Sequence, residues 1–153
     1  MSVTILVNGR ATTAECEPTD MLTEVLRGAG LTSVRETCRI GVCGACTVLL
    51  DGQPVSGCLT MAAQVEGREV TTVEGLGGSH PVQRAFVDAH AFQCGWCTPG
   101  FVLTAVSLLD ENTAPSDAEI AEALGGNLCR CGSYVKINEA VRCAGAAMQR
   151  EHA

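Results

Sequence analysis

Apolar and polar residues alternate along much of the first half of the chain, which is typical of β-strands with one buried face. Five short segments alternate in this way or form brief apolar runs, at 3–7, 10–16, 46–50, 53–56 and 68–74. Asn8-Gly9 and Asp51-Gly52 each separate two of these segments, and such dipeptides favour tight hairpin turns, of type I′ for Asn8-Gly9. The pattern therefore predicts two hairpins and one further strand.

One helix is expected among these strands. Apolar residues recur there with helical spacing and are expected to face inward, at Met21, Leu22, Val25, Leu26 and Ala29. Thr19 or Asp20 is the expected N-cap, and Gly28 and Gly30 are expected to end the helix. A sheet crossed by one helix, with a cysteine-rich loop beside it, is a β-grasp pattern.

The spacing of apolar residues changes from about two to about 3.6 near residue 76, within EGLGGSHP. Four helices are expected to follow. The caps expected for the first three are Ser79, Thr98 and Ser116, the last in a capping box with Glu119. The fourth has an apolar face made of Ile137, Ala140, Val141, Ala144 and Met148. We therefore predict an α+β fold, with a β-grasp domain at 1–76 and an all-α four-helix domain at 77–153.

Composition narrows the function classes. The chain has 153 residues, 46% of them apolar, and a net charge of −7 without a cluster of Lys and Arg, which argues against nucleic-acid binding and favours protein partners. No apolar run approaches the roughly 18 residues of a membrane span. The first residues, MSVTILVNGRA, lack the features of a signal peptide, so a cytoplasmic location is expected. In a reducing compartment, closely spaced cysteines more often bind metal or do redox chemistry than form disulfides.

Ten cysteines are present, and four of them have the spacing C-x4-C-x2-C followed by one more: Cys38, Cys43, Cys46 and Cys58. This is the plant-type spacing for a 2Fe-2S cluster. Gly41, Gly44 and Gly57 are expected to adopt positive φ and to let backbone N–H groups point at the sulfurs. A zinc site or ordinary buried cysteines are the alternatives, but three ligands from one loop resemble a cluster cradle more than paired zinc knuckles.

A second set comprises Cys94, Cys97, Cys129 and Cys131, as one C-x2-C pair and one C-x-C pair. Each pair precedes the second helix of an expected helix pair, so the positive ends of two helices would face an anionic group between them. The spacing alone also fits tetrahedral zinc, although four sulfur ligands favour a soft metal site. Cys16, on an expected strand, and Cys143, on the last helix, are expected to be small core residues.

Five motifs in order look like the iron-sulfur small subunit of the xanthine oxidase family of molybdenum hydroxylases: CRIGVCGACTVLLDGQPVSGCLT, TTVEGL, HPVQRAF, QCGWCTPGF and GNLCRCGSYVKI. The resemblance covers nearly the whole chain and implies a β-grasp ferredoxin domain and a four-helix domain, each holding one 2Fe-2S cluster. By position, the set from Cys38 to Cys58 would bind the outer cluster and the set from Cys94 to Cys131 the inner one.

The resemblance further implies a separate large subunit that holds molybdopterin, contacted by Gln93 and Cys131, and a medium subunit that holds FAD. The expected assembly is a heterotrimer or a dimer of heterotrimers. Two departures affect loop shape only. Gly132-Ser133 stands where the family usually has Thr-Gly, and Arg39 stands where it usually has glycine.

No G-x-G-x-x-G after a strand and no P-loop occur in the sequence, so it does not signal flavin or nucleotide binding on this chain. We therefore expect an electron-transfer subunit of an oxidoreductase, with no substrate chemistry of its own. It would pass electrons from molybdopterin through two clusters to a flavin subunit or another acceptor. The alternatives are a free-standing ferredoxin-like carrier, which needs only the first domain, and a zinc-stabilised interaction module.

Overall fold

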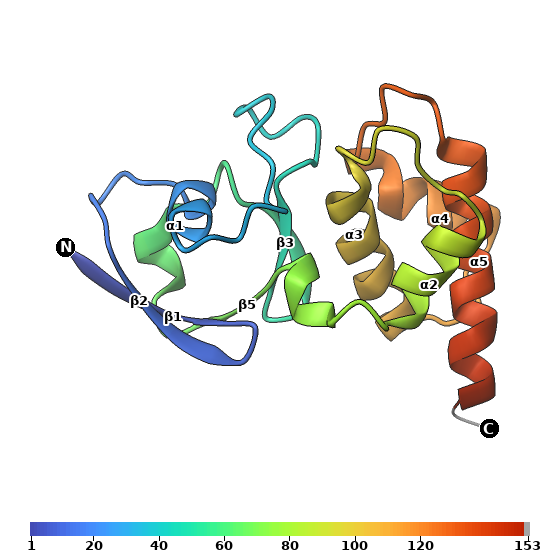
Figure 1. Ribbon diagram of the computed structural model, residues 1–153, viewed down its shortest axis with the longest axis horizontal. Helices are drawn as coiled ribbons and strands as arrows, with labels where there is room; N and C mark the ends of the chain where they lie inside the picture. The colour runs from blue at the N-terminus through green and yellow to red at the C-terminus, as the bar shows by residue number, and fades with distance from the viewer. Residues whose placement is uncertain (152–153) are drawn as a thin grey trace.

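The computed structural model describes residues 1–151, and within them it confirms an α+β fold (Figure 1). The strands are β1 (Ser2–Val7), β2 (Arg10–Glu15), β3 (Thr47–Leu50), β4 (Gln53–Ser56) and β5 (Glu69–Thr71). They form one mixed sheet in the order β2-β1-β5-β3-β4, in which only the pairing of β1 with β5 is parallel. The α-helices are α1 (Leu22–Gly28), α2 (Pro81–Asp88), α3 (Thr98–Glu111), α4 (Asp117–Ala123) and α5 (Tyr134–Glu151).

Both expected hairpins are present, because their turn residues adopt the required backbone conformation. Asn8 and Gly9 have φ of 50° and 76°, and Asp51 and Gly52 have φ of 49° and 83°. Positive φ at both turn positions is the signature of a type I′ turn, which matches the twist of the flanking strands. The turn chemistry readable in the sequence therefore determines the register of β1 with β2 and of β3 with β4.

Two predictions about the sheet region are corrected. The segment at 68–74 was expected to be a strand, but β5 ends at Thr71 because the backbone N–H of Thr72 donates to Asn8 Oδ1 at 2.8 Å and the chain then enters a 3₁₀ turn, Val73–Leu76. Ala29 was expected to face inward and is exposed, because α1 has already ended at Gly28.

Three helices start one or more residues away from their expected caps. Met21, His80 and Cys97 occupy the N-cap positions in place of Thr19 or Asp20, Ser79 and Thr98. Asp20 instead accepts a hydrogen bond from the backbone of Glu17 at 2.8 Å and shapes the preceding turn. At α2 the ring Nδ1 of His80 accepts from the backbone N–H of Val82 at 3.2 Å, so histidine does the capping that serine was expected to do.

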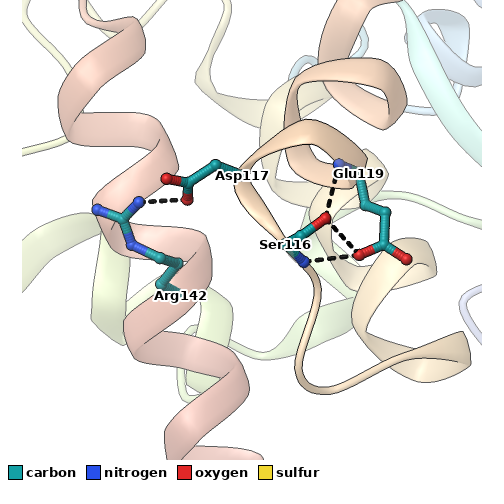
Figure 2. Close-up of polar contacts among 4 residues, drawn as sticks. All are labelled: Ser116, Asp117, Glu119 and Arg142. Carbon is teal, nitrogen blue, oxygen red and sulfur yellow. Dashed lines mark hydrogen bonds and ion pairs between the residues drawn. The ribbon is translucent and has the colours of Figure 1, made fainter.

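The capping box of α4 is confirmed (Figure 2). Ser116 Oγ accepts from the backbone N–H of Glu119 at 3.3 Å, and the backbone N–H of Ser116 donates to Glu119 Oε2 at 2.7 Å. Arg142 on α5 forms an ion pair with Asp117 in the first turn of α4, which ties the two helices together at the surface. All five residues expected on the inner face of α5 are buried.

Two hydrophobic cores lie side by side. The first core lies between the sheet and α1 and includes Val3, Ile5 and Leu22. The second core lies among α2 to α5 and includes Phe101 and Ile120. Leu49 of β3 belongs to the helical core, and α3 lies against β3 (Figure 1). The two parts are therefore packed directly on one another. None of the helices within residues 1–151 has the length and apolar character needed to cross a membrane.

Candidate iron-sulfur sites

The first cysteine set is assembled by one loop and one hairpin. Cys38 and Cys43 lie on the loop between α1 and β3, whereas Cys46 directly precedes β3 and Cys58 follows β4. Antiparallel pairing of β3 with β4 brings the two ends of the hairpin together, and the backbone N–H of Gly57 donates to the carbonyl of Cys46 at 3.3 Å. Two residues distant in sequence, Cys46 and Cys58, are thereby both buried at the same end of the sheet.

The thiols of this set interact in two pairs. Backbone N–H groups of Ile40 and Cys43 point at Cys38 and, with the Cys43 thiol, lower the pKa of Cys38 to about 6. Burial is the main cause that raises the pKa of Cys46 to about 12, and the adjacent Cys58 thiol adds to this. The pairs are thus Cys38 with Cys43, and Cys46 with Cys58.

The second set is assembled by the N-termini of two helices. Cys94 and Cys97 lie immediately before α3, and Cys129 and Cys131 lie before α5. This confirms the expected position of each cysteine pair, at the positive end of a helix dipole. The cradle is partly open, because Cys94 is exposed while Cys129 is buried.

Here too the thiols interact in pairs. The backbone N–H of Trp96 and the thiol of Cys131 lower the pKa of Cys94. Burial and the neighbouring thiol of Cys129 raise the pKa of Cys97 to about 12.

At Cys129, burial opposes ionisation, but hydrogen bonds to the sulfur outweigh burial and lower its pKa. The donors include the backbone N–H of Ser133, 3.5 Å from Sγ, and the thiol of Cys97. The pairs of the second set are thus Cys94 with Cys131, and Cys97 with Cys129.

This pairing suits a binuclear cluster. In a 2Fe-2S cluster, four thiolates are shared between two irons, two to each, whereas structural zinc takes all four ligands in one tetrahedron. All ten cysteines are free thiols, and several sulfurs receive backbone N–H donors. The residues present therefore fit a 2Fe-2S cluster in each set.

Gln93 and Cys131, expected at a cofactor, are brought together across the second set. Gln93 Nε2 donates to the backbone carbonyl of Cys131 at 3.4 Å, although the two residues are far apart in the sequence. The Gln93 side chain is exposed, as is Phe92 beside it. Gln93 and Phe92 therefore lie at an accessible edge of the second set.

The structure also contains a direct bridge between the two cysteine sets, which sequence reasoning missed. The backbone N–H of Leu128, next to Cys129, donates to the carbonyl of Cys43 at 2.9 Å. The buried side chain of Asn127 donates to the carbonyl of Gly44 at 3.0 Å and accepts from Thr104 Oγ1 at 3.0 Å. One ligand segment of each set is thus hydrogen bonded to the other. The GNLC motif was visible in the sequence, but it carries no signal of a partner so far upstream.

Several expectations about single residues need adjustment. Gly41 and Gly44 have positive φ, of 75° and 66°, as predicted. Gly57 does not, so the prediction of positive φ was wrong for that glycine. Arg39 has φ of 57°, which explains why glycine is favoured there in the family that the sequence resembles. Cys16 is buried, as expected, but it follows β2 rather than lying on it. Cys143 is exposed on α5 and is not a core residue.

Two family models of 2Fe-2S binding domains match the chain. Residues 4–93 match the family described as 2Fe-2S iron-sulfur cluster binding domain, and residues 72–142 match the family described as 2Fe-2S binding domain. The chain is 46% identical to the nicotinate dehydrogenase small FeS subunit of Eubacterium barkeri, over 94% of each chain. It is 47% identical to the nicotine 6-hydroxylase small subunit of Paenarthrobacter nicotinovorans, over 92% of this chain and 87% of the relative.

Solved structures agree over nearly the whole chain. A chain of quinoline 2-oxidoreductase from Pseudomonas putida 86 superposes with a TM-score of 0.93 at 42% identity, covering 98% of this chain and 96% of the other. The aldehyde oxidoreductase of Desulfovibrio desulfuricans also gives a TM-score of 0.93, at 43% identity, but there the match spans 17% of a much longer chain. With two 2Fe-2S family matches, two paired sets of thiols and relatives of this kind, the chain belongs to the iron-sulfur small subunits of the xanthine oxidase family of molybdenum hydroxylases, and its role is electron transfer within an oxidoreductase.

Proposed function

We propose that the chain consists of two cluster-binding domains, a β-grasp ferredoxin-like domain at 1–76 and a four-helix domain at 77–153. The two hydrophobic cores support this division, since one is built mainly from the sheet and α1 and the other from α2 to α5. The proposed boundary falls at the end of the 3₁₀ turn Val73–Leu76, where Gly77 adopts φ of 69° and the chain leaves the sheet region. Residues 152–153 of the second domain lie outside the described part of the chain.

The first domain would hold the outer cluster through Cys38, Cys43, Cys46 and Cys58, and the second domain the inner cluster through Cys94, Cys97, Cys129 and Cys131. The observation that carries this proposal is the placement of each set by the fold, the first at one end of the β3–β4 hairpin and the second at the N-termini of α3 and α5, and the interactions among the thiols support it. When bound, such clusters accept and release single electrons. The protein's part is to hold the thiolates, to donate backbone N–H groups to them and to keep the two loops in contact through Leu128 and Asn127.

A large subunit would dock over the second set and place its molybdopterin beside Gln93 and Cys131. Exposed apolar side chains near this set support a protein partner there: Phe92, Trp96, Leu128, Tyr134 and Val135.

A medium subunit with FAD, or another acceptor, would face the loop of the first set, where Ile40 and Val42 are exposed. The assembly would be a heterotrimer or a dimer of heterotrimers. The ten free thiols favour the reducing cytoplasm.

Electrons would therefore enter beside Gln93 and Cys131 and leave near Cys38 and Cys43. The test is EPR on the assembled enzyme, with Cys43→Ser and Cys97→Ser as variants. Because the sets are separate, each variant is expected to abolish one of two reduced-state signals and to leave the other intact. In Cys43→Ser, rapid mixing with a reducing substrate should still reduce the inner cluster. An inner cluster that stayed oxidised while molybdenum was reduced would reverse the proposed order.

Replacing Gln93 by Ala tests the molybdopterin contact. The change removes a side-chain amide at an exposed edge and leaves all eight cysteines in place, so iron content should be unchanged. A hydrogen bond of this kind contributes roughly 0.5–3 kcal/mol, depending on charge and burial, so turnover or molybdopterin retention should fall. Gln64→Ala, in the 3₁₀ turn Ala62–Val65 of the first domain, is the control and should leave both unchanged. If Gln93→Ala behaved like the control, Gln93 would have no role at the pterin.

A further inference from the structure

Arg35 lies between the two cysteine loops and contacts a residue of each. Its backbone N–H donates to the carbonyl of Ala45, between Cys43 and Cys46, at 3.1 Å. Its guanidinium carbon lies 4.7 Å from the ring centroid of Trp96, which stands between Cys94 and Cys97. A guanidinium over an indole face is held by a cation–π interaction. One positive charge is therefore positioned at the junction of the two sets.

Trp96 is itself fixed by the first loop. Its indole N–H donates to Thr37 Oγ1 at 2.8 Å, and Thr37 precedes Cys38. Arg35, Thr37 and Trp96 thus form a second bridge between the sets, separate from the one made by Asn127. The contact with the ring favours a position of the guanidinium at the junction.

The charge of Arg35 lacks a carboxylate partner in the described part of the chain. The ion pairs within residues 1–151 are Arg39 with Glu36, Arg68 with Asp51, Lys136 with Glu139, and Arg142 with Asp117. Arg35 Nε is also buried without a hydrogen-bond partner, and the other buried side-chain atom in this state within residues 1–151 is Thr98 Oγ1, next to Cys97. Arg35 as a whole is half-buried, and a partly desolvated cation without an ion-pair partner is stabilised by negative charge nearby. The two proposed cysteine sets, when they hold clusters as thiolates, would supply negative charge at this junction.

We propose that Arg35 tunes electron transfer through its charge, which raises the reduction potentials of both clusters. The inference rests on the proposed ligand sets. Each cluster gains one negative charge when it accepts one electron, and a fixed cation in a partly dry environment stabilises that added charge. Charge and hydrogen bonding around the sulfurs are established means of setting such potentials. Arg35 does so for both clusters at once, because it lies between them.

The test is an EPR-monitored redox titration of the assembled enzyme with Arg35→Met, Arg35→Lys and Arg68→Met. Methionine keeps an apolar stem against Trp96 but removes the charge, so both midpoint potentials should become more negative. The expected change is on the order of tenfold in the equilibrium constant for reduction, the scale of one partly buried charge interaction at an effective dielectric constant of about 20. Lysine should restore most of it, because it keeps the charge.

Arg68→Met is the matched control. It removes the same charge from Arg68, which directly precedes β5 and pairs at the surface with Asp51 in the turn after β3. Any effect of this exposed site should disappear in high salt, whereas the effect of Arg35 should persist there. Unchanged potentials in Arg35→Met with both signals present would overturn the inference, as would an equal shift in Arg35→Lys. Absence of two signals from the unmodified enzyme would instead contradict the proposed ligand sets.

Discussion

At the scale of single residues, two glycines, which have no side chain, allow the two cysteine loops to approach each other closely. A Cβ at Gly100, in the first turn of α3, would lie 2.2 Å from the carbonyl oxygen of Gly44. A Cβ at Gly44 would lie 2.4 Å from the carbonyl oxygen of Gly126, and Gly44 also has φ of 66°. The backbone of the first loop therefore rests directly on the start of α3, in a way that only glycine permits.

Gly100→Ala should therefore destabilise the protein although it improves helix propensity. Alanine in a helix gains up to about 1 kcal/mol over glycine, but overpacking against fixed backbone costs about 1–3 kcal/mol, so a net loss is expected in thermal or denaturant unfolding. Gly28→Ala in the last turn of α1 is the control, since a Cβ added there would have no neighbouring atom within 4 Å. It should be neutral or stabilising. A stable Gly100→Ala protein with unchanged cluster spectra would contradict the close approach.

At the scale of elements, hydrogen bonds to one carboxylate hold the loop after α1 against the 3₁₀ turn Val73–Leu76. The carboxylate of Glu74 accepts from the backbone N–H of Ser33 at 3.0 Å and from Thr72 Oγ1 at 2.6 Å, and it also accepts from the hydroxyl of Ser33. Burial alone would raise the pKa of Glu74, but these donors outweigh it and hold the pKa below its usual value. The ionised form is therefore favoured by folding.

This predicts a pH-dependent contribution to stability. Because the pKa of Glu74 is lower in the folded than in the unfolded chain, the contribution is present above the unfolded pKa, near 4.3, and is lost as pH falls through the folded pKa. Glu74→Gln should lower the free energy of unfolding at pH 7, and the difference from the unmodified protein should shrink below about pH 4.5. Glu66→Gln, at an exposed position without a side-chain hydrogen bond in residues 1–151, should show no such trend. A difference independent of pH would mean that the charge of Glu74 is not involved.

At the scale of the whole molecule, Asn127 is a buried polar residue that joins the two parts. Its amide donates to Gly44 of the first loop and to Thr47 at the start of β3, and its carbonyl oxygen accepts from Thr104 on α3. Only 4% of its surface is exposed. Removal of such a side chain leaves buried partners without hydrogen bonds, which typically costs about 1–3 kcal/mol for each unsatisfied group.

Asn127→Ala should therefore lower the unfolding free energy by about 1–3 kcal/mol or more and loosen the contact between the two cysteine sets. The second effect should appear in EPR as a changed magnetic interaction between the two reduced clusters, with both signals still present. Asn112→Ala removes an exposed asparagine that accepts only from the backbone of Ala114, and it should cost less and leave the spectra alone. Equal effects of the two changes would show that Asn127 does not join the parts.

The sequence by itself determined the features that depend on neighbouring residues: the two hairpins through Asn8-Gly9 and Asp51-Gly52, the capping box at Ser116, the buried face of α5 and the spacing of the eight cysteines. It erred by one or two residues at three helix starts, and at one of them, α2, the side chain of His80 does the capping.

Tertiary structure alone decided which thiols pair, that the carbonyl of Cys43 meets the N–H of Leu128, and that Arg35 rests on Trp96. The physical reason is that turns and helices follow local backbone preferences, whereas these contacts arise only when two separate cores pack together.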